Sequence, residues 1–246
     1  MIVGMIPARY NSLRFPGKLL HPILGKPLLQ HTYERALSIS LLDQLWILTD
    51  DTRIEQQART FTDKVIRTGS ADSGTERIAQ VLKREFLDLP EESIVVNIQG
   101  DQPLVVPQTV EALIDALEKD GEAVLSTPLV LSCQRELLQA FSTVKCVRDR
   151  GGRALYFSRA CIPWGAEEAY LHVGIYAYRL SFLRRYFSLP QSTLAESEDL
   201  EQLKILEGGY AISTPVVWQR PYDVNLPGDV PIVAKFLSSE VQSCSH

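Results

Sequence analysis

Three cations lie close together near the start of the chain, in the stretch Pro7-Ala-Arg-Tyr-Asn-Ser-Leu-Arg-Phe-Pro-Gly-Lys18. They are Arg9, Arg14 and Lys18, spread over ten residues. Positive side chains at this spacing repel one another unless an anion faces them, so the stretch favours contact with a polyanion such as a chain of phosphates. A solvated loop without a ligand is the alternative, which the cations alone do not exclude.

Asp101 is the first candidate metal ligand. It follows an apolar segment, 93–99, that predicts a buried strand, and Gly100-Asp-Gln-Pro103 stops that strand sharply. An acidic residue past the carboxyl end of a central strand lies where open α/β sheets bind ligands. A lone carboxylate beside phosphates is a usual way to hold Mg²⁺, whereas a plain turn is the alternative interpretation. The nearby basic stretch favours the Mg²⁺ site.

A polar loop, Ser73-Gly-Thr-Glu-Arg77, precedes an apolar segment with helical spacing. Backbone N–H groups at a helix start accept anions and carbonyl oxygens, so this loop is a candidate for binding a base and a ribose. A capping box between Ser73 and Glu76 is the purely structural interpretation, and the two are compatible.

Further candidates lie in the second half of the chain. Arg159 follows the aromatic pair Tyr156-Phe157 and suits a bidentate grip on a carboxylate. His172 and Tyr176 share a segment with alternating polarity, although a lone histidine is more often structural than functional. Glu201 and Gln202 fall on a predicted helix, for which a solvated charged face is the alternative.

The elements that must position these residues alternate between strand and helix in the first half. Apolar runs predict strands over 2–6, 45–49, 64–67 and 93–99, with Pro7 ending the first, and helices lie between them. This alternation predicts an α/β fold with a mostly parallel sheet covered by helices on both faces. The second half is less regular, with one strand predicted over 172–179 and one helix over 196–207. We expect a single domain, 1–246, with about 128–190 as a smaller sub-domain.

Composition narrows the class of protein. A net charge of −5 argues against a nucleic-acid surface, and 45% hydrophobic residues are ordinary for a globular chain. Cys133, Cys146, Cys161 and Cys244 are far apart, so we expect reduced thiols. No apolar stretch has the length of a membrane span or signal peptide, which predicts a soluble cytoplasmic protein without membrane partners. There is no Walker lysine motif, GxGxxG fingerprint or recognisable nucleophile context.

Several of these motifs together resemble one family. Beyond the basic stretch they include Gly25-Lys-Pro27, Ser73 to Arg77, Val96-Asn-Ile-Gln-Gly-Asp101, Ala154-Leu-Tyr-Phe-Ser-Arg159, the 172–179 segment and Leu200-Glu-Gln-Leu203. In this order they resemble the sugar-acid cytidylyltransferases, and the last motifs favour the enzymes of 3-deoxy-manno-octulosonate (Kdo) over those of sialic acid.

The resemblance implies a three-layer α/β/α Rossmann-like nucleotidyltransferase fold. It also implies transfer of CMP from CTP to Kdo for lipopolysaccharide biosynthesis, with Mg²⁺ as cofactor, pyrophosphate as co-product and a homodimeric assembly. The roles that it implies fall into four groups: Arg9, Arg14 and Lys18 for the triphosphate; Ser73, Gly74, Thr75, Arg77 and Gln99 for cytosine and ribose; Asp101 for Mg²⁺; and Arg159, His172, Tyr176, Glu201 and Gln202 for the sugar acid.

The sequence departs from the family near its end. Members commonly read Val-Asp-Thr-Pro-Glu-Asp, whose first aspartate is the second metal carboxylate, but here the run is Val224-Asn-Leu-Pro-Gly-Asp229. Either Asn225 binds the metal through its amide oxygen or Asp223 replaces it. The stretch from Trp164 to His172 is also shorter than usual, which affects the sugar pocket or a subunit contact.

Three alternative functions stay open at this point. The same chemistry on another sugar acid, such as sialic acid, is the nearest. A glycosyltransferase usually carries an Asp-x-Asp motif after a strand, whereas Asp101 is followed by Gln102-Pro103. A non-catalytic nucleotide-binding module would leave the sugar-acid residues without a purpose.

Overall fold

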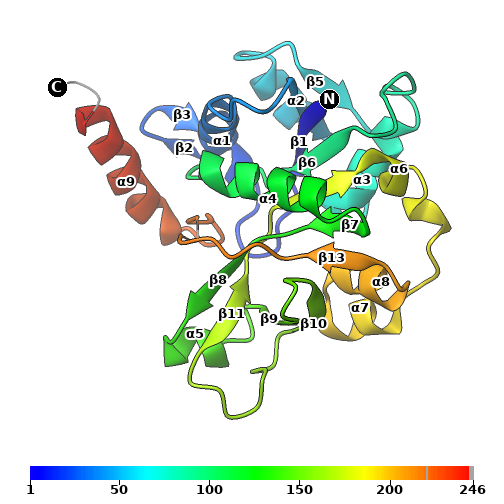
Figure 1. The fold of residues 1–246 in the computed structure, drawn as a ribbon. Coiled ribbons are helices and arrows are strands. Elements are labelled where there is room, and N and C mark those ends of the chain that lie inside the picture. Colours follow the sequence, from blue (N-terminus) through cyan, green and yellow to red (C-terminus); the bar gives the residue numbers. More distant parts are fainter. Residues whose placement is uncertain (220, 244–246) are drawn as a thin grey trace. The chain divides into compact units, whose positions relative to one another are not determined.

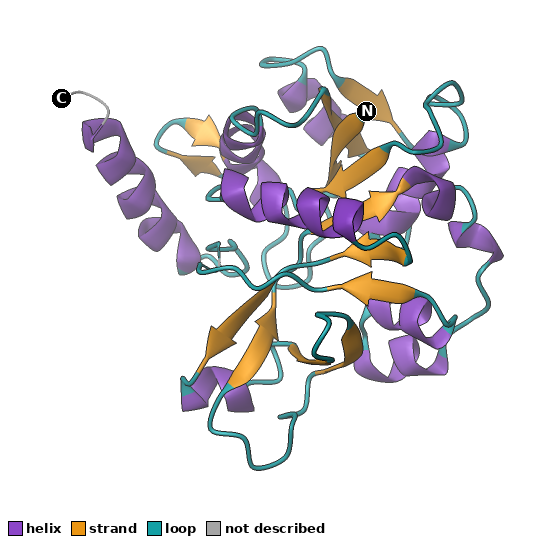
Figure 2. Ribbon diagram, in the orientation of Figure 1, coloured by secondary structure: helices purple, strands orange, loops and turns teal. Residues whose placement is uncertain are grey.

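The computed structural model describes residues 1–219 and 221–243 of the chain (Figure 1). Seven strands form one sheet in the order β13-β7-β12-β6-β1-β4-β5, and four form an antiparallel sheet in the order β10-β9-β11-β8. The predicted α/β class, with a mostly parallel sheet and a smaller element, is confirmed. Figure 2 shows the helices and strands separately by colour. No helix in the described part of the chain is both long and apolar enough to cross a membrane.

The element bounds are as follows. The larger sheet contains β1 (Ile2–Ala8), β4 (Gln44–Thr49), β5 (Val65–Arg67), β6 (Ile94–Asn97), β7 (Ala123–Ser126), β12 (Tyr176–Arg179) and β13 (Ala211–Ser213). The smaller sheet contains β8 (Leu129–Ser132), β9 (Lys145–Arg148), β10 (Ala154–Ser158) and β11 (Ala169–His172), and β2 (Pro22–Ile23) pairs with β3 (Lys26–Pro27). The helices are α1 (Leu28–Ala36), α2 (Thr52–Ala58), α3 (Gly74–Leu82), α4 (Pro107–Lys119), α5 (Arg135–Gln139), α6 (Leu180–Leu183), α7 (Thr193–Glu198), α8 (Glu201–Glu207), α9 (Asp229–Ser243), η1 (Lys18–Leu20) and η2 (Tyr186–Ser188).

The chain divides into two compact units, which we describe one at a time. The N-terminal unit contains Ile2–Phe86, Asn97–Pro107 and Pro221–His246. The central unit contains Met1, Leu87–Val96 and Gln108–Arg220. All strands of the antiparallel sheet fall inside the predicted 128–190 sub-domain, but its bounds stay a prediction.

The N-terminal unit is built on parallel strands. β1 pairs with β4, which pairs with β5, and the side chains of Met5, Ile47 and Leu48 are fully buried, although Ile47 and Leu48 point to opposite faces of the sheet. The prediction that Pro7 ends the first strand is wrong, because β1 continues to Ala8 with Pro7 opposite Leu48. A proline lacks only one donor, and its carbonyl can still accept a ladder hydrogen bond. The strand therefore carries the chain to the very edge of the basic loop.

The central unit corrects two predicted elements. The strand predicted over 172–179 is broken, since β11 ends at His172 in the antiparallel sheet and β12 begins at Tyr176 in the larger one. The helix predicted over 196–207 is two helices, α7 and α8, separated at Asp199. Asp199 has a left-handed backbone (φ 52°), which an aspartate tolerates better than most residues and which ends α7.

Candidate active site

Lys18 and Asp101 form an ion pair in the N-terminal unit, between the basic loop and the turn that follows β6. Lys18 begins η1, and its ammonium donates to the Asp101 carboxylate and, at 2.9 Å, to the carbonyl of Val224. Asp101 lies in the turn that follows β6, as predicted from the sequence. Both side chains are mostly buried, with 12% and 23% exposed. A charge pair that is kept partly from water at the carboxyl end of a strand is well placed to meet an anionic ligand.

The segment 223–225 is tied to the same place. The backbone N–H of Val224 donates to the carbonyl of Asp101 at 2.9 Å, and a guanidinium nitrogen of Arg14 donates to Asn225 Oδ1 at 3.0 Å. Two segments far apart in sequence, the basic loop and 223–225, therefore meet around Asp101. The structure brings Arg14, Lys18, Asp101 and Asn225 together, and their roles toward a ligand stay predictions.

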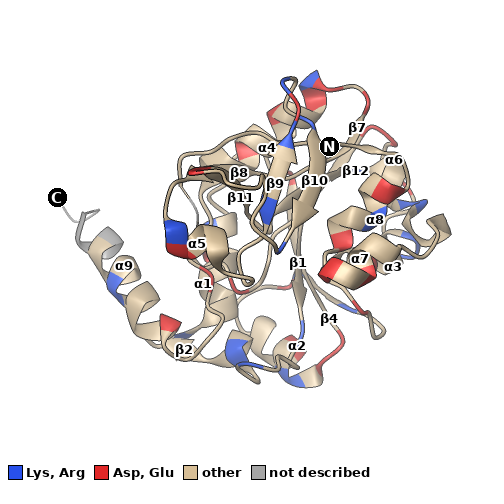
Figure 3. Cartoon of the chain, turned by 90° about the horizontal axis from the view of Figure 1, so that it is seen from below, with Lys and Arg blue, Asp and Glu red and all other residues tan. Residues whose placement is uncertain are grey.

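Arg9 differs from the other two cations of the loop. It is exposed, and its side chain forms no hydrogen bond or ion pair with another side chain in the described parts of the unit. The loop around it is nevertheless ordered by local contacts, because Gly17 takes a left-handed conformation (φ 70°) and donates to the carbonyl of Tyr10 at 3.0 Å. The Tyr10 ring stacks on Arg53, whose guanidinium is neutralised by Asp51. Charges of both signs lie together on α2 (Figure 3) and offset one another there. The basic loop that contains Arg9 therefore carries the excess positive charge of this neighbourhood.

The Ser73 loop has the expected cap. Ser73 Oγ accepts from the N–H of Glu76 at 3.1 Å, and Glu76 accepts from the N–H of Asp72 at 2.7 Å. A side chain at Gly74 would approach Pro7 to 3.3 Å, so glycine allows this loop to lie against the end of β1. The predicted ligands Ser73 and Gly74 therefore stand beside the strand that feeds the basic loop.

The other predicted base and ribose ligands are more enclosed. Thr75 is fully buried, and Arg77 is 3% exposed, with its guanidinium on Thr68, the Gly69 carbonyl and Asp50. Through these contacts Arg77 holds the loop at Thr68 and Gly69 in place. Its contact with a substrate stays a prediction. Gln99 donates to Asn97 Oδ1 at 3.2 Å, which orients its amide.

The donor chemistry near Asp101 fits Mg²⁺. The oxygens available are the Asp101 carboxylate, the Asn225 amide and, two residues before it, the Asp223 carboxylate. No group of three or more histidine, cysteine or acidic side chains suited to a metal gathers within residues 1–219 and 221–243. Mg²⁺ commonly takes one or two carboxylates and completes its shell with water and substrate phosphates, so a sparse oxygen set is the expected kind. Softer metals would need the missing nitrogen or sulfur ligands.

In the central unit, Arg159 sits where β10 ends and binds the turn between α7 and α8. Its guanidinium donates to the carbonyl of Glu198 at 2.7 Å, to Asp199 and to the Phe141 carbonyl at 3.2 Å. Its backbone N–H donates to the Glu198 carboxylate at 2.8 Å. The side chain is thus held by protein carbonyls and by the Asp199 carboxylate, and a carboxylate ligand would have to add to or replace these contacts.

His172 and Tyr176 lie on either side of the break between β11 and β12. The His172 ring is 8% exposed, packs edge-on against Phe157 and lies 5.5 Å from the Tyr176 ring, centroid to centroid. Burial, with a smaller contribution from the Glu201 carboxylate, raises the pKa of the Tyr176 phenol well above its ordinary value. The structure therefore brings three predicted sugar-acid residues, His172, Tyr176 and Glu201, into one neighbourhood.

Gln202 is the clearest sign of an unmet ligand in the central unit. It lies in the first turn of α8, 1% exposed, and its Nε2 has no hydrogen-bond partner within the described residues. A buried amide donor without a partner costs free energy, so such a group usually awaits a ligand or a water molecule. The alternative interpretation, a solvated charged face of this helix, does not hold at Gln202, which is buried.

Comparison with known proteins gives the family. The family model described as "Cytidylyltransferase" matches residues 3–212. This chain belongs to the cytidylyltransferase family. It is 42% identical to the 3-deoxy-manno-octulosonate cytidylyltransferase of Protochlamydia amoebophila, over 97% of this chain and 95% of that one. It is 43% identical to the enzyme of the same name from Syntrophobacter fumaroxidans, over 97% and 98%.

A solved structure agrees. It is described as CMP:2-keto-3-deoxy-manno-octonic acid synthetase complexed with CTP, and it is similar to this cytidylyltransferase with a TM-score of 0.89 and 37% identity. The match covers 97% of this chain and 99% of the other. The resemblance drawn from the sequence motifs is therefore confirmed, as is the nucleotidyltransferase class.

Two buried residues of this cytidylyltransferase were missed by the sequence analysis. Lys145 is fully buried, and its ammonium donates to the carbonyls of Ala140 at 3.1 Å, Thr143 at 2.7 Å and Arg159. Burial lowers the pKa of its amine. Thr127 is also fully buried and contacts His172. Neither lies in a run of polar residues, so only the folded chain reveals them.

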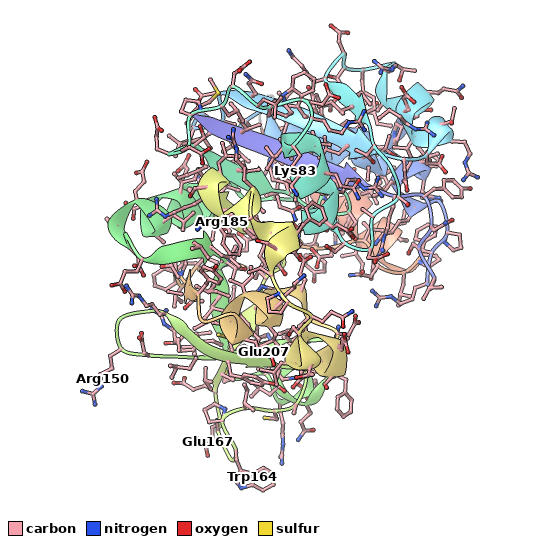
Figure 4. All side chains as sticks on the ribbon, turned by 90° about the vertical axis from the view of Figure 1, so that its right-hand side faces the viewer. Lys83, Arg150, Trp164, Glu167, Arg185 and Glu207 are labelled. Carbon is pink, nitrogen blue, oxygen red and sulfur yellow. The ribbon has the colours of Figure 1, made fainter. Side chains whose placement is uncertain are left out.

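The stretch before His172 that we expected to be short consists of the end of the loop between β10 and β11, followed by β11 itself. Figure 4 shows Trp164 and Glu167 on this loop, with the Trp164 side chain pointing away from the ribbon. Trp164 is 98% exposed.

The cysteines in the described residues are free thiols, as expected from their spacing. Cys133 is exposed, Cys161 is half-buried and Cys146 is buried. Burial raises the pKa of the Cys146 thiol to about 12. Cys244 lies outside the described residues.

Proposed function

We propose that this chain transfers CMP from CTP to the anomeric hydroxyl of Kdo, releasing pyrophosphate and giving CMP-Kdo for lipopolysaccharide biosynthesis. The two 3-deoxy-manno-octulosonate cytidylyltransferases compared above are 42% and 43% identical to this chain over nearly its full length. A similar structure carries CTP. The observation that carries the proposal is the ion pair of Lys18 with Asp101, which joins the basic loop to the carboxylate at the end of β6.

The chemistry is an in-line displacement at the α-phosphate and needs no covalent enzyme intermediate. The cations Arg9, Arg14 and Lys18 would neutralise the triphosphate and stabilise the negative charge that grows on the leaving pyrophosphate. Arg9, which has no ion pair among the described residues, is ready to do so without breaking a contact. The Lys18 ammonium would contact both Asp101 and the nucleotide, so its contact with Asp101 would change when a nucleotide binds.

We propose Mg²⁺ as the cofactor. Asp101 would hold it with either Asn225 or Asp223, and when bound it neutralises the triphosphate and acidifies the attacking hydroxyl. The Arg14 guanidinium on Asn225 Oδ1 keeps that amide oxygen turned toward the basic loop. The carbonyl of Val224 holds Lys18 beside the same carboxylate.

The remaining substrate contacts are proposals of the same kind. Ser73, Gly74, Thr75, Arg77 and Gln99 would recognise cytosine and ribose, and Arg159, His172, Tyr176, Glu201 and Gln202 would bind the sugar acid. The unpartnered Nε2 of Gln202 supports the second group, because a sugar hydroxyl or carboxylate supplies the acceptor that it lacks. A homodimer and a cytoplasmic location also remain proposals, the first testable by light scattering.

The test is pyrophosphate release from CTP and Mg²⁺, run in parallel with Kdo, with sialic acid and without sugar. We expect release with Kdo alone. Equal or faster release with sialic acid would replace the substrate and keep the reaction. CTP binding without release under any of the three conditions would identify a nucleotide-binding module instead.

A further inference from the structure

The Thr127 hydroxyl has one hydrogen to donate and three polar atoms within hydrogen-bond distance. Its Oγ1 lies 2.8 Å from His172 Nε2, 2.9 Å from the carbonyl oxygen of Ile175 and 3.2 Å from that of Val173. All of these atoms are in the central unit, and Thr127 is fully buried. The hydroxyl follows directly after β7 and reaches the two carbonyls because the chain breaks between β11 and β12.

The proton count decides which atom donates. A carbonyl oxygen can only accept, so two oxygens at 2.9 and 3.2 Å from Oγ1 repel it unless its hydrogen points toward them. If the hydroxyl donates to a carbonyl, its lone pair faces His172, and the ring nitrogen must donate. The opposite arrangement would leave the carbonyl oxygens of Val173 and Ile175 facing a lone pair of a buried hydroxyl, which is unfavourable.

We propose that Thr127 is a positioning residue that fixes His172 as the Nε2–H tautomer. In the neutral ring Nδ1 then carries the lone pair, so any group that meets this nitrogen must donate a proton to it, as a sugar hydroxyl can and a carboxylate cannot. This second part rests on the proposed function. The Phe157 ring packed edge-on against His172 and the Tyr176 ring beside it limit rotation of the imidazole, so the tautomer and the orientation are set together.

The direct test is the tautomer itself, which needs no substrate. In protein with ¹⁵N-labelled histidine, the signals of His172 are assigned with His172→Gln, because the chain has four histidines. We expect a protonated Nε2 in the wild type and in Thr127→Ser. We expect a mixture of tautomers in Thr127→Val, which keeps the shape but removes the hydroxyl. A wild-type Nδ1–H ring would overturn the proposal.

Kinetics test the recognition. Thr127→Val should raise the KM for Kdo by about tenfold and leave the KM for CTP unchanged, while Thr127→Ser stays near the wild type. The matched control is Thr214→Val, which removes another buried hydroxyl of the same unit, one that donates to the Gly152 carbonyl at 2.7 Å. It should leave the KM for Kdo unchanged.

The outcomes separate this proposal from the proposed function. An unchanged KM for Kdo in Thr127→Val, or an equal loss in Thr127→Ser and Thr214→Val, overturns the positioning role. If the wild type releases no pyrophosphate with Kdo, the proposed substrate fails, yet the labelled spectrum still reports whether Thr127 sets the tautomer.

Discussion

The two units prepare for ligands in opposite ways. In the N-terminal unit the candidate groups are cations on a loop, and one of them, Arg9, is exposed and without an ion pair among the described residues. In the central unit the candidate groups are buried and held by carbonyls and rings, as Arg159 and His172 are. The contrast teaches that candidate groups can be presented in two ways: as exposed positive charge, as at Arg9, or as buried groups whose orientation is fixed by hydrogen bonds and ring contacts, as at Arg159 and His172.

The first variants remove the charge pair. Lys18→Ala and Asp101→Ala should each lower turnover by about 10²–10³-fold, the usual loss when a group that stabilises the transition state is removed. The melting temperature should fall by several degrees, because each variant leaves the other member of the mostly buried pair without its counter-charge, but this loss is small beside the loss of turnover. Turnover is followed by pyrophosphate release, and a folded variant of near-wild-type activity would remove that residue from the chemistry.

The second comparison sets Arg159 against Arg9. Arg159→Ala should raise the KM for Kdo by about tenfold or more and lower the melting temperature by several degrees, since it removes several hydrogen bonds at about 1 kcal/mol each. Arg9→Ala should leave the melting temperature unchanged and raise the KM for CTP. Equal thermal effects of the two variants would erase the distinction between the units.

The third comparison asks which residue completes the metal site. Asn225→Asp adds a carboxylate beside Asp101 and should lower the Mg²⁺ concentration for half-maximal activity by roughly threefold or more. Asp223→Asn is the matched change in the opposite sense. If the Mg²⁺ requirement follows Asp223→Asn and ignores Asn225→Asp, then Asp223 is the second ligand.

The smallest expected effect is a pH dependence of stability. Burial holds the pKa of Tyr176 well above its ordinary value of 10.0. Above that ordinary value the unfolded chain ionises its phenol while the folded chain does not, so this contribution to stability is complete below about pH 10 and is lost as the pH rises. Tyr176→Phe should flatten the fall in the free energy of unfolding between about pH 10 and 11. The exposed Tyr222→Phe is the control, and an identical pH profile for both would contradict the assignment.

The sequence predicted the N-terminal unit well because its signals are contiguous. The basic stretch, the strand before Asp101 and the Ser73 cap each occupy one short run, and local rules of charge and capping apply to them directly. These runs, together with the motifs of the central unit, carried the resemblance to the family, and the family, the α/β class and the nucleotidyltransferase activity are confirmed.

The central unit was harder because its key positions depend on sheet assignment. An alternating run over 172–179 predicts one strand, but periodicity cannot reveal that its two halves belong to different sheets. Likewise, Asp199 ends a helix through a left-handed backbone, which a charged residue in an acidic run does not signal. Thr127 acquires its contacts from the break between β11 and β12, and Lys145 acquires its contacts from the carbonyls of Ala140, Thr143 and Arg159, so no sequence pattern could have pointed to either.

Lys145 also gives the central unit a built-in chemical reporter. Its amine is fully buried and its hydrogen bonds gather the carbonyls of Ala140, Thr143 and Arg159 around one nitrogen. An acylating reagent can reach it only when this cluster opens, whereas the exposed lysines react at once. The labelling rate of Lys145 therefore reports how often the region around Arg159 opens. A ligand bound by Arg159 should lower that rate.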